Sequence, residues 1–357
     1  MRSRAAAPLA TLRRAGVAHD ASLVGVARRA AYLRLRGGFR LAEASTLGLL
    51  DPHLDRQELA IYVSRAELRT AQDALNPLEL ESHTEEKAVF AQLCDAADLP
   101  TPTVYAVLRQ GEAGWTSGGS SPSGSEEWKT ALRRDLPGEF VVKPTRASFG
   151  LGLEIYSRSA DELADSAGRP VAFGALVERL CTDSRYKAWI FQERLRNHAE
   201  LRAVSGTDTL QTLRIVTLLA KDGSVEILSG CLKVVMGDAV VDNIRGGETG
   251  NAVCDLGLKD GRLGEAYVLR PDGFGMVTCA AHPRTGIVFS EVCVPYWAET
   301  LALVERASHA FADLRTLGWD VAITEGGPVI IEANMWWGGF NEWGTMPEIM
   351  AALRDAT

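Results

Sequence analysis

The sequence lacks the features that define several classes of protein. Its six cysteines are widely spaced and include no Cys-x-x-Cys pair, which fits reduced thiols in the cytosol and gives no cysteine-based metal site. No run of 18 or more apolar residues occurs, so we expect no membrane span. An excess of positive charge is also missing: the formal net charge is −8, which argues against a general nucleic-acid binder. We therefore expect a cytoplasmic protein in which a polyanionic ligand needs a local basic site.

Acidic residues are scarce in residues 1–40, which contain nine arginines and one acid, Asp20. This segment has no continuous apolar core, so we do not expect a secretory signal. Three alternatives stay open for it: a transit peptide, a helix that lies on a membrane surface, and a basic helical face in contact with solvent.

The chain has 357 residues, which is too long for one small core and suits two or three subdomains. Apolar residues at three- and four-residue spacing predict helices over residues 23–35, 57–75 and 84–97. Residues 111–128 are rich in glycine and serine and poor in core residues, which predicts a mobile loop or linker. Strand patterns dominate after residue 210, and their mixture with helices favours an α+β fold over a parallel sheet with alternating helices.

The most specific pattern lies near the C-terminus. The segment GWDVAIT contains Asp320, and IIEAN contains Glu332 and Asn334. Glu332 and Asn334 are two residues apart on one predicted strand and therefore face the same side. A hairpin turn at residues 326–328 would return this strand against Asp320. Three oxygen-bearing side chains on one surface are the ligands that Mg²⁺ prefers, and the alternative is an ordinary polar sheet face.

This spacing resembles the metal-binding end of the ATP-grasp superfamily. The resemblance implies an ATP-grasp fold, in which two α+β lobes clamp ATP, preceded here by an N-terminal helical region. It also implies that Asp320, Glu332 and Asn334 bind Mg²⁺, with Mn²⁺ as an alternative. On this basis we expect four regions: an N-terminal helical region at 1–80, a central subdomain at 81–137 with a flexible loop at 111–128, a lid subdomain at 138–196, and a C-terminal subdomain with the metal site at 197–357.

Two segments resemble the phosphate-binding parts of the superfamily. Lys143, in FVVKP, resembles the lysine at the end of the first strand of the lid, which contacts the phosphates and the adenine side of ATP. The following segment, TRASFGLG, resembles the glycine-rich flap, which implies that Ser148, Gly150 and Gly152 close over the phosphates. Glycines let backbone N–H groups approach an anion closely, although a tight hairpin would have the same pattern.

Other residues resemble those that bind the rest of the nucleotide. Residues 192–195 resemble the hinge that holds adenine through backbone hydrogen bonds and an apolar wall; they are Gln192, Glu193, Arg194 and Leu195. Glu200 follows seven residues after Glu193, as the ribose-binding carboxylate does in the D-alanine–D-alanine ligase branch, and His198 is a rival for that role. Lys87 precedes a Leu-Pro pair, as a nucleotide-binding lysine does in the same branch. The alternatives are a solvated loop acid for Glu200 and a surface lysine for Lys87.

Arg214 in TLRIVT and Lys233 in CLKVV lie on neighbouring predicted strands. Both resemble the cationic residues that hold the γ-phosphate and the acyl-phosphate in ATP-grasp enzymes. Such cations stabilise developing phosphate charge strongly in a partly dry cleft. The alternative is that they are strand-edge charges in salt bridges.

An ordered set of motifs narrows the resemblance. VDNIRGGETG at 241–250, HPRTG at 282–286, GWDVAIT and IEAN together resemble the sugar-transfer-associated ATP-grasp family. The resemblance implies a catalytic role for Asn243 and places Asp242, Gly246 and Gly247 near the phosphates or the acceptor, with His282 as a further candidate. Three tryptophans near the C-terminus would either stack on an acceptor or seal the core: Trp336, Trp337 and Trp343.

The function implied by the resemblance is an ATP-dependent ligase. A substrate carboxylate would attack the γ-phosphorus of ATP, and an amine, or a thiol, would then displace phosphate from the acyl-phosphate. Amino-acid, peptide, envelope or polysaccharide-related substrates all fit, and the oligomeric state stays open, with a homodimer as one option. Three alternatives remain: a kinase-like phosphoryl transfer, an ATP-binding regulatory protein with little turnover, and a membrane-surface accessory to polysaccharide synthesis.

Overall fold

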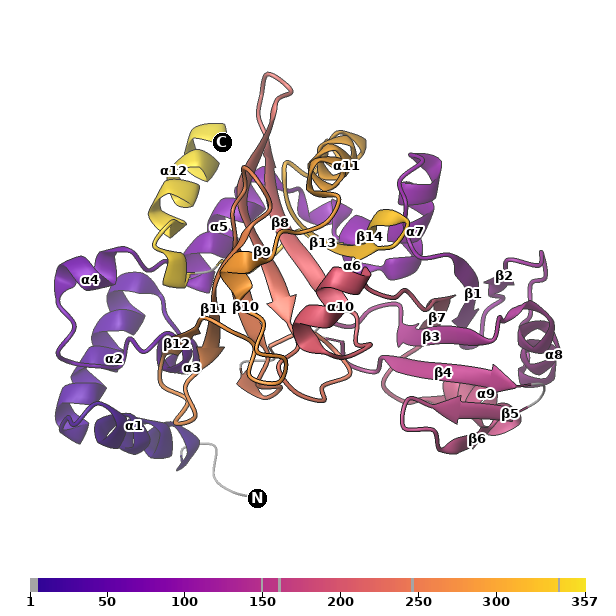
Figure 1. The fold of residues 1–357 in the computed structure, drawn as a ribbon, viewed down its shortest axis with the longest axis horizontal. Helices are drawn as coiled ribbons and strands as arrows, with labels where there is room; N and C mark the ends of the chain where they lie inside the picture. Colours follow the sequence, from indigo (N-terminus) through magenta and orange to yellow (C-terminus); the bar gives the residue numbers. More distant parts are fainter. Residues whose placement is uncertain (1–5, 149, 160–161, 245–246, 340) are drawn as a thin grey trace.

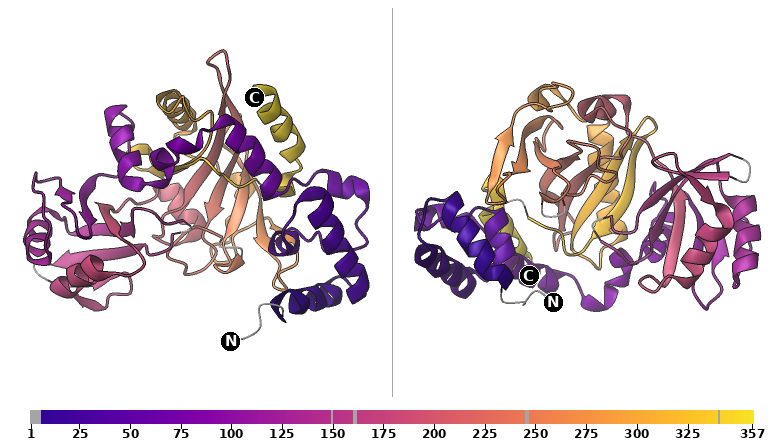
Figure 2. Two further views of the ribbon diagram at one scale, coloured as in Figure 1. Left: turned by 180° about the vertical axis from the view of Figure 1, so that it is seen from behind. Right: turned by 90° about the horizontal axis from the view of Figure 1, so that it is seen from below.

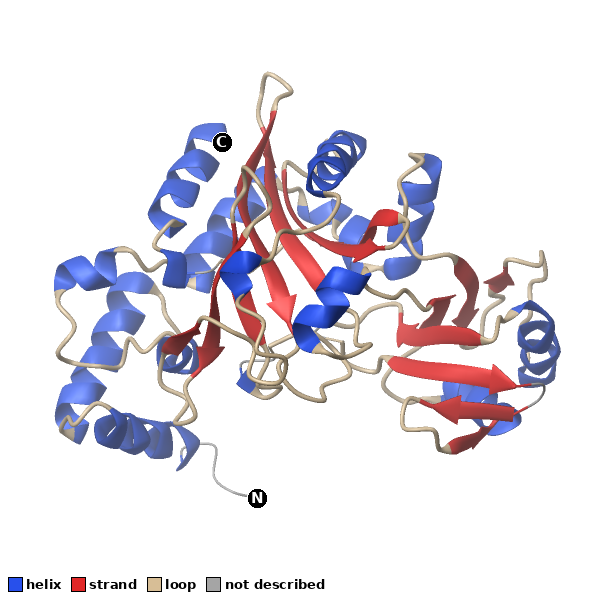
Figure 3. Ribbon diagram, in the orientation of Figure 1, coloured by secondary structure: helices blue, strands red, loops and turns tan. Residues whose placement is uncertain are grey.

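The structure is a computed structural model that describes residues 6–148, 150–159, 162–244, 247–339 and 341–357. Two lobes lie side by side, each built on one seven-stranded antiparallel sheet, and an additional group of helices flanks one of them (Figures 1 and 3). We call the lobe with strands β1–β7 the small lobe and the lobe with strands β8–β14 the large lobe. The mixture of helices and antiparallel sheets confirms the α+β class.

The first part of the described chain is helical. Its elements are α1 (Ala6–Ala18), α2 (Leu23–Gly37), α3 (Leu41–Thr46), α4 (Arg56–Ala60), α5 (Arg65–Leu75), η1 (Leu78–Leu80) and α6 (Ser82–Glu85). Local sequence explains the bounds of α2: the Ser22 side chain accepts the N–H of Gly25, and Gly38 ends the helix with a φ of 73°. The single helix that we expected over 57–75 is wrong. Ser64 starts a new helix by capping the N–H of Glu67, and the Asn341 side chain binds both backbone groups of Val63 just before it.

The small lobe has the strand order β2-β1-β7-β3-β4-β5-β6. Its elements are β1 (Val104–Arg109), β2 (Trp115–Thr116), α8 (Ser125–Asp135), β3 (Glu139–Pro144), β4 (Glu154–Ser159), β5 (Glu162–Asp165), β6 (Pro170–Ala172), α9 (Phe173–Thr182) and β7 (Ala188–Glu193). Helices α8 and α9 bury apolar side chains against this sheet, among them Trp128 and Leu176. The expected boundary at 137/138 falls between strands of this one sheet, and the division into four regions stays a prediction.

The loop that we expected over 111–128 is wrong in part. This segment contains β2 and the first turn of α8, and Trp128 is fully buried in the core of the small lobe. Gly114 packs so closely on the Trp128 ring that an added Cβ would lie 2.4 Å from it. Composition alone did not predict this packing, because the large apolar surface buried by the single Trp128 side chain orders a segment that is otherwise rich in glycine and serine.

The large lobe has the strand order β12-β11-β10-β9-β8-β13-β14. Its elements are α7 (Lys87–Ala96), α10 (Ala199–Ser205), β8 (Thr212–Leu219), β9 (Val225–Val234), β10 (Ala252–Leu256), β11 (Leu263–Leu269), β12 (Met276–Cys279), η3 (Phe289–Glu291), α11 (Trp297–Ala310), β13 (Thr316–Thr324), β14 (Gly327–Asn334), η4 (Asn341–Trp343) and α12 (Met346–Ala356). Helices α7, α10 and α11 share one hydrophobic core with the sheet, and α5 and α12 share another with β8. The sheet is therefore sandwiched between helices, as the views in Figure 2 show.

The C-terminal hairpin is confirmed. Strands β13 and β14 pair antiparallel from Thr324 opposite Gly327 to Gly318 opposite Asn334. The turn is one residue earlier than we expected, at 325–326. In the described part of the chain no helix is long and apolar enough to cross a membrane.

Candidate active site

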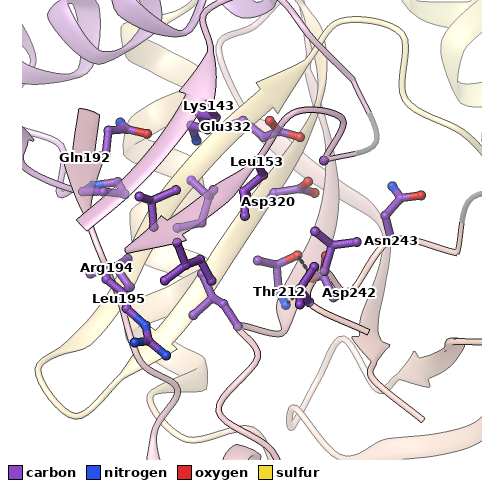
Figure 4. A pocket seen from close by; sticks show the side chains of 18 of the residues that line it. Lys143, Leu153, Gln192, Arg194, Leu195, Thr212, Asp242, Asn243, Asp320 and Glu332 are labelled. Carbon is purple, nitrogen blue, oxygen red and sulfur yellow. Dashed lines mark hydrogen bonds between the residues drawn. The ribbon is translucent and has the colours of Figure 1, made fainter. Parts of the chain in front are cut away.

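A cleft lies between the two lobes, with about 1100 Å³ of space outside the protein atoms when its open side is included. Strands β3, β4 and β7 form one wall, and β8, β9, β13 and β14 form the other (Figure 4). Twelve of the residues selected from the sequence line it: Lys87, Lys143, Gly150, Gln192, Glu193, Arg194, Leu195, Lys233, Asp242, Asn243, Asp320 and Glu332. Those that do not line it include Ser148, Gly152, Glu200, Arg214 and Asn334.

The acidic end of the cleft lies on the C-terminal hairpin. Asp320 on β13 is directly opposite Glu332 on β14, so both carboxylates project from the same face of the sheet (Figure 4). Glu332 is half-buried and makes no hydrogen bond or ion pair with any described residue. The Asn334 amide donates to the carbonyl of Gly318 at 3.4 Å. The two carboxylates thus face the cleft, and Asn334 lies just outside its lining.

Asp320 is held by two cations of the same lobe. Nε of Arg214 lies 2.5 Å from Oδ1 of Asp320, and Nζ of Lys233 lies 2.7 Å from Oδ2. Burial alone would raise the pKa of Asp320, but the two cations hold it well below its usual range. Burial alone would lower the pKa of Arg214 and of Lys233, but the attraction of Asp320 raises both. These three groups form a buried, ion-paired cluster with a net charge of +1.

Two other lysines line the cleft in a different state, Lys143 from the small lobe and Lys87 from the start of α7. Lys143 at the end of β3 is only 9% exposed, and its ammonium makes no hydrogen bond or ion pair with a described residue. Burial, reinforced by the nearby charge of Lys87, lowers the pKa of Lys143 to about 8. Lys87 begins α7, and its Nζ donates to the carbonyl of Ala147 at 2.6 Å. Neither lysine is neutralised by an acid in contact with it.

The loop after β3 folds back over the lysines. The backbone N–H of Lys87 donates to the carbonyl of Thr145, which ties the start of the loop to α7. Gly150 and Gly152 have φ values of 65° and 73°. A Cβ on Gly152 would also lie 2.8 Å from the Pro144 ring, so this position requires glycine. The Ser148 side chain is exposed.

The hinge end of the cleft is apolar. Val141 and Ile155 of the small lobe and Leu210 and Ile331 of the large lobe line it, together with Leu195. The backbone N–H of Leu195 has no hydrogen-bond partner among the described residues. A flat heteroaromatic ring bound between these apolar walls would find this N–H available as a donor.

The Glu193 carboxylate accepts the backbone N–H and the hydroxyl of Thr103, each at 3.1 Å. Its side chain therefore anchors the hinge to the start of β1.

The carboxylate expected to bind ribose is elsewhere. Glu200 is exposed on α10 and does not line the cleft. His198 caps the same helix, lies 3.5 Å from Glu325 and packs on Tyr296. The carboxylate that lines the cleft in this region is Asp208, just beyond α10. The short helix turns Glu200 outward, which a count of residues along the chain could not predict.

The motif at 241–250 brings further polar groups to the cleft. Asp242 is half-buried and accepts the backbone N–H and the hydroxyl of Thr212 at 2.8 and 2.6 Å. Burial raises the pKa of Asp242, although Lys233 opposes this shift. Asn243 also lines the cleft, and Thr249 donates its hydroxyl to the Asn243 carbonyl at 2.7 Å. Gly246 lies outside the described residues.

His282 and the tryptophans have structural contacts away from the cleft. His282 is fully buried; Nδ1 accepts the backbone N–H of Arg284, and Nε2 lies 2.9 Å from the carbonyl of Val235. Trp337 is buried and donates to the Thr316 hydroxyl. Trp336 donates to Asp73 of α5, and Trp343 does not line the cleft either. For Trp336 and Trp337 the contacts favour the sealing role.

The model of the family described as sugar-transfer associated ATP-grasp matches residues 69–341. This match covers most of the chain and decides the assignment. The chain belongs to the sugar-transfer associated ATP-grasp family. It therefore has the ATP-grasp fold, and the two lobes and the cleft between them are those of this superfamily. A search of curated proteins gives no match.

Solved ATP-grasp structures resemble the chain only distantly. They include the biotin carboxylase–beta-gamma-ATP complex from Campylobacter jejuni (9% identity, TM-score 0.44, 77% of this chain and 46% of that one). They also include D-alanyl-alanine synthetase A from Vibrio cholerae (12% identity, TM-score 0.39, 76% and 66%). A third is phosphoribosylamine–glycine ligase from Thermotoga maritima (12% identity, TM-score 0.40, 73% and 50%). The chain spans about half to two thirds of their length, and its assignment rests on the family match rather than on these likenesses.

The acidic end of this ATP-grasp cleft has a donor set that suits a hard cation. Among the described residues no three His, Cys, Asp or Glu side chains form a metal cluster, so the protein offers two carboxylates, Asp320 and Glu332, with the Asn334 amide nearby. Mg²⁺ typically takes one or two carboxylates from a protein and fills its octahedron with phosphate oxygens and water. The residues therefore fit Mg²⁺ that arrives with a nucleotide.

Sequence reasoning missed some residues of this ATP-grasp site. Thr212 and Asp208 line the cleft, but neither stands in a distinctive motif. Glu85 on α6 is a further acid near this end: burial raises its pKa, Lys87 opposes the shift, and the charge of Glu332 adds to it. The sequence signal for Glu85 is the pair of consecutive acids directly before Lys87, at the start of the helix expected over 84–97.

Proposed function

We propose that this chain is an ATP-dependent ligase that joins a carboxylate to an amine through an acyl-phosphate and releases ADP and phosphate. One observation carries the proposal: the unpaired, buried ammonium of Lys143 faces the same cleft as the carboxylates of Asp320 and Glu332. A buried cation without an anion is costly, and a nucleotide phosphate would supply the missing charge. The apolar hinge at the other end supports the placement of adenine there.

The chemistry has two balanced steps. A carboxylate oxygen of the substrate attacks the γ-phosphorus, and the bond to the β-γ bridging oxygen breaks to leave ADP. The amine nitrogen then attacks the acyl carbon, phosphate leaves with the bonding electron pair, and the amine loses a proton. Neither step needs a protein nucleophile, so positioning and electrostatic stabilisation account for the rate.

Each wall has its own part in this proposal. Lys87 and Lys143 neutralise the phosphate chain, while Gly150 and Gly152 let the flap lie close over it and exclude water. Lys233, which lines the cleft and is oriented by Asp320, stabilises charge on the transferred phosphoryl group, and Arg214, ion-paired with Asp320 outside the lining, adds positive charge at the same end. Asn243, on the loop opposite the flap, contacts the acceptor side.

The metal belongs to the same proposal. Asp320 and Glu332, with Asn334 next to them, would hold Mg²⁺, or Mn²⁺ as an alternative. When bound, the metal would supply positive charge to the phosphate oxygens.

The proposal includes several classes of substrate. An amino acid, a peptide or an envelope- or polysaccharide-related acid would provide the carboxylate, and an amine, or a thiol, would accept the acyl group. We place the reaction in the cytoplasm, where ATP is supplied, and keep a homodimer as an option.

The test is product analysis of Mg²⁺-dependent ATP turnover against pools of amino acids, small peptides and uronic acids, with ADP and free phosphate read separately. Hydroxylamine, added without an amine acceptor, should trap the acyl-phosphate as a hydroxamate. We expect ADP and phosphate in equal amounts, both absent with Glu332→Gln. ADP without free phosphate would favour kinase-like transfer to a hydroxyl, and nucleotide binding without stimulated turnover would favour a regulatory role.

A further inference from the structure

The N-terminal helices α1 and α2 combine exposed apolar side chains with exposed arginines. Twelve large hydrophobic side chains are exposed in the described chain, and six of them lie on these two helices: Leu9, Val17, Leu23, Val24, Tyr32 and Leu35. Val17 is 85% exposed and Leu35 is 83% exposed. Such a concentration on two helices is unusual for a face that only meets water.

The apolar residues of α2 form one stripe. Val24, Ala31 and Leu35 are exposed at helical spacing, with Arg28 between them. Val26 and Leu33 on the opposite side of the helix are buried in the local core. Helix α1 repeats the arrangement, since Leu9, Arg13 and Val17 follow one another at intervals of four. Both helices therefore present an apolar outer stripe that contains an arginine.

The arginines of this region lack acidic partners. None of the seven arginines between residues 6 and 40 forms an ion pair with a described acid. Arginines elsewhere in the described chain commonly do, as Arg69 does with Asp73, Arg284 with Asp238 and Arg354 with Glu67. The positive charge of α1 and α2 is thus not neutralised within the molecule, although the whole chain has a net charge of −8.

We infer that the outer faces of α1 and α2 dock onto the surface of a membrane that contains anionic lipids. Exposed aliphatic side chains would enter the boundary between headgroups and acyl chains, and Arg13, Arg28 and Arg36 would lie among the negative headgroups. Charge complementarity favours this occupant, since a mixed face of unpaired arginines and aliphatic residues suits a lipid interface. The proposal is independent of the reaction in the cleft.

The placement of the helices is compatible with catalysis on a membrane. Helices α1 and α2 form the end of the molecule opposite the small lobe (Figures 1 and 2). Docking through this end leaves the cleft between the lobes uncovered. An envelope-related acceptor held in the same membrane would then be close to the enzyme.

The test is sedimentation of the full chain with vesicles of phosphatidylcholine alone and with 30% phosphatidylglycerol. We expect binding to the anionic vesicles only, weakened by high salt. Val24→Ser with Leu35→Ser should reduce the partition coefficient at least tenfold, as should Arg13→Gln with Arg28→Gln and Arg36→Gln. Matched controls are Leu78→Ser and Arg306→Gln, exposed residues of the same types outside this face. Thermal unfolding checks that every variant is folded.

Three results would overturn the inference. The wild-type chain could stay in the supernatant with anionic vesicles, or both sets of variants could bind like the wild type. Alternatively, sedimentation equilibrium without lipid could show self-association that Val24→Ser with Leu35→Ser abolishes, which would assign the face to a second copy of the chain.

Discussion

The two walls of the cleft hold their cations in opposite states. On the large lobe, Arg214 and Lys233 are paired with Asp320, and their pKa values are raised. On the small lobe, Lys143 is equally buried, has no described partner, and has a pKa lowered to about 8. The two cations of the large lobe share a carboxylate within the protein, whereas Lys143 has no acid in contact with it. The difference indicates that Lys143, rather than Arg214 or Lys233, is the buried cation that lacks a counter-charge within the protein.

The largest effect should come from breaking the ion-paired cluster of Arg214, Lys233 and Asp320. Asp320→Asn leaves Arg214 and Lys233 buried without a counter-charge, which should lower the free energy of unfolding by about 3–5 kcal/mol and abolish ATP turnover. Urea unfolding and turnover assays measure both. Asp222→Asn is the matched control, since Asp222 is an exposed turn residue hydrogen-bonded to Ser224. An unchanged free energy of unfolding for Asp320→Asn would mean that the ion pairs of Asp320 with Arg214 and Lys233 do not stabilise the fold.

Glu332 should separate function from stability. Glu332→Gln removes a carboxylate that has no described partner, so turnover should fall at least about a hundredfold while the free energy of unfolding changes by less than roughly 0.5 kcal/mol. Glu226→Gln, an exposed acid on β9, is the control for the same chemical change. Full activity of Glu332→Gln would show that the Glu332 carboxylate is not needed for ATP turnover.

Lys143→Met should stabilise the protein without nucleotide, by roughly 1–3 kcal/mol at pH 7, because it removes a buried, unneutralised charge. The pKa of about 8 in the fold lies below the ordinary value of 10.5. The unfolded chain therefore binds more protons between these values, and wild-type stability rises from pH 8 to pH 10.5 relative to the variant. Chemical unfolding at several pH values checks this, with Lys187→Met as an exposed control. Destabilisation by Lys143→Met would show that the ammonium has a partner.

The smallest effect concerns the hinge end. Asp208→Ala should weaken ATP binding about fivefold, because its carboxylate lines the cleft, whereas Glu200→Ala should leave binding unchanged. Calorimetric titration of both variants decides between them. Weaker ATP binding by Glu200→Ala, with unchanged binding by Asp208→Ala, would instead support Glu200 as the ribose-binding carboxylate that the sequence resemblance implies.

The sequence predicted the elements whose pattern is local. Two strand patterns joined by a glycine- and proline-containing turn predicted the C-terminal hairpin, and an antiparallel pair with a two-residue turn leaves little freedom for such a segment. Lys143 was selected because FVVKP, followed by a glycine-rich segment, resembles the first strand of the ATP-grasp lid. The α+β class followed from the mixture of helical and strand periods.

What the sequence could not predict depends on contacts between distant segments. The pairing of Arg214 and Lys233 with Asp320 depends on the register of β8, β9 and β13, and a β-bulge follows Asp320 in the pairing with β14. The outward position of Glu200 depends on a helix of seven residues, whose short pattern carries little signal. The burial of Trp128 depends on the core of the small lobe, which no local window contains.

The most direct measurement is the binding of Mg-ATP between pH 7.5 and pH 9, in buffers of different ionisation enthalpy. If the Lys143 ammonium binds the phosphates of ATP, Lys143 should take up a proton on binding above pH 8. The dissociation constant should then rise roughly tenfold by pH 9. Lys143→Met should bind more weakly at pH 7.5 and show neither effect. Equal affinities and equal proton uptake for wild type and Lys143→Met would contradict the assignment of this wall to the nucleotide.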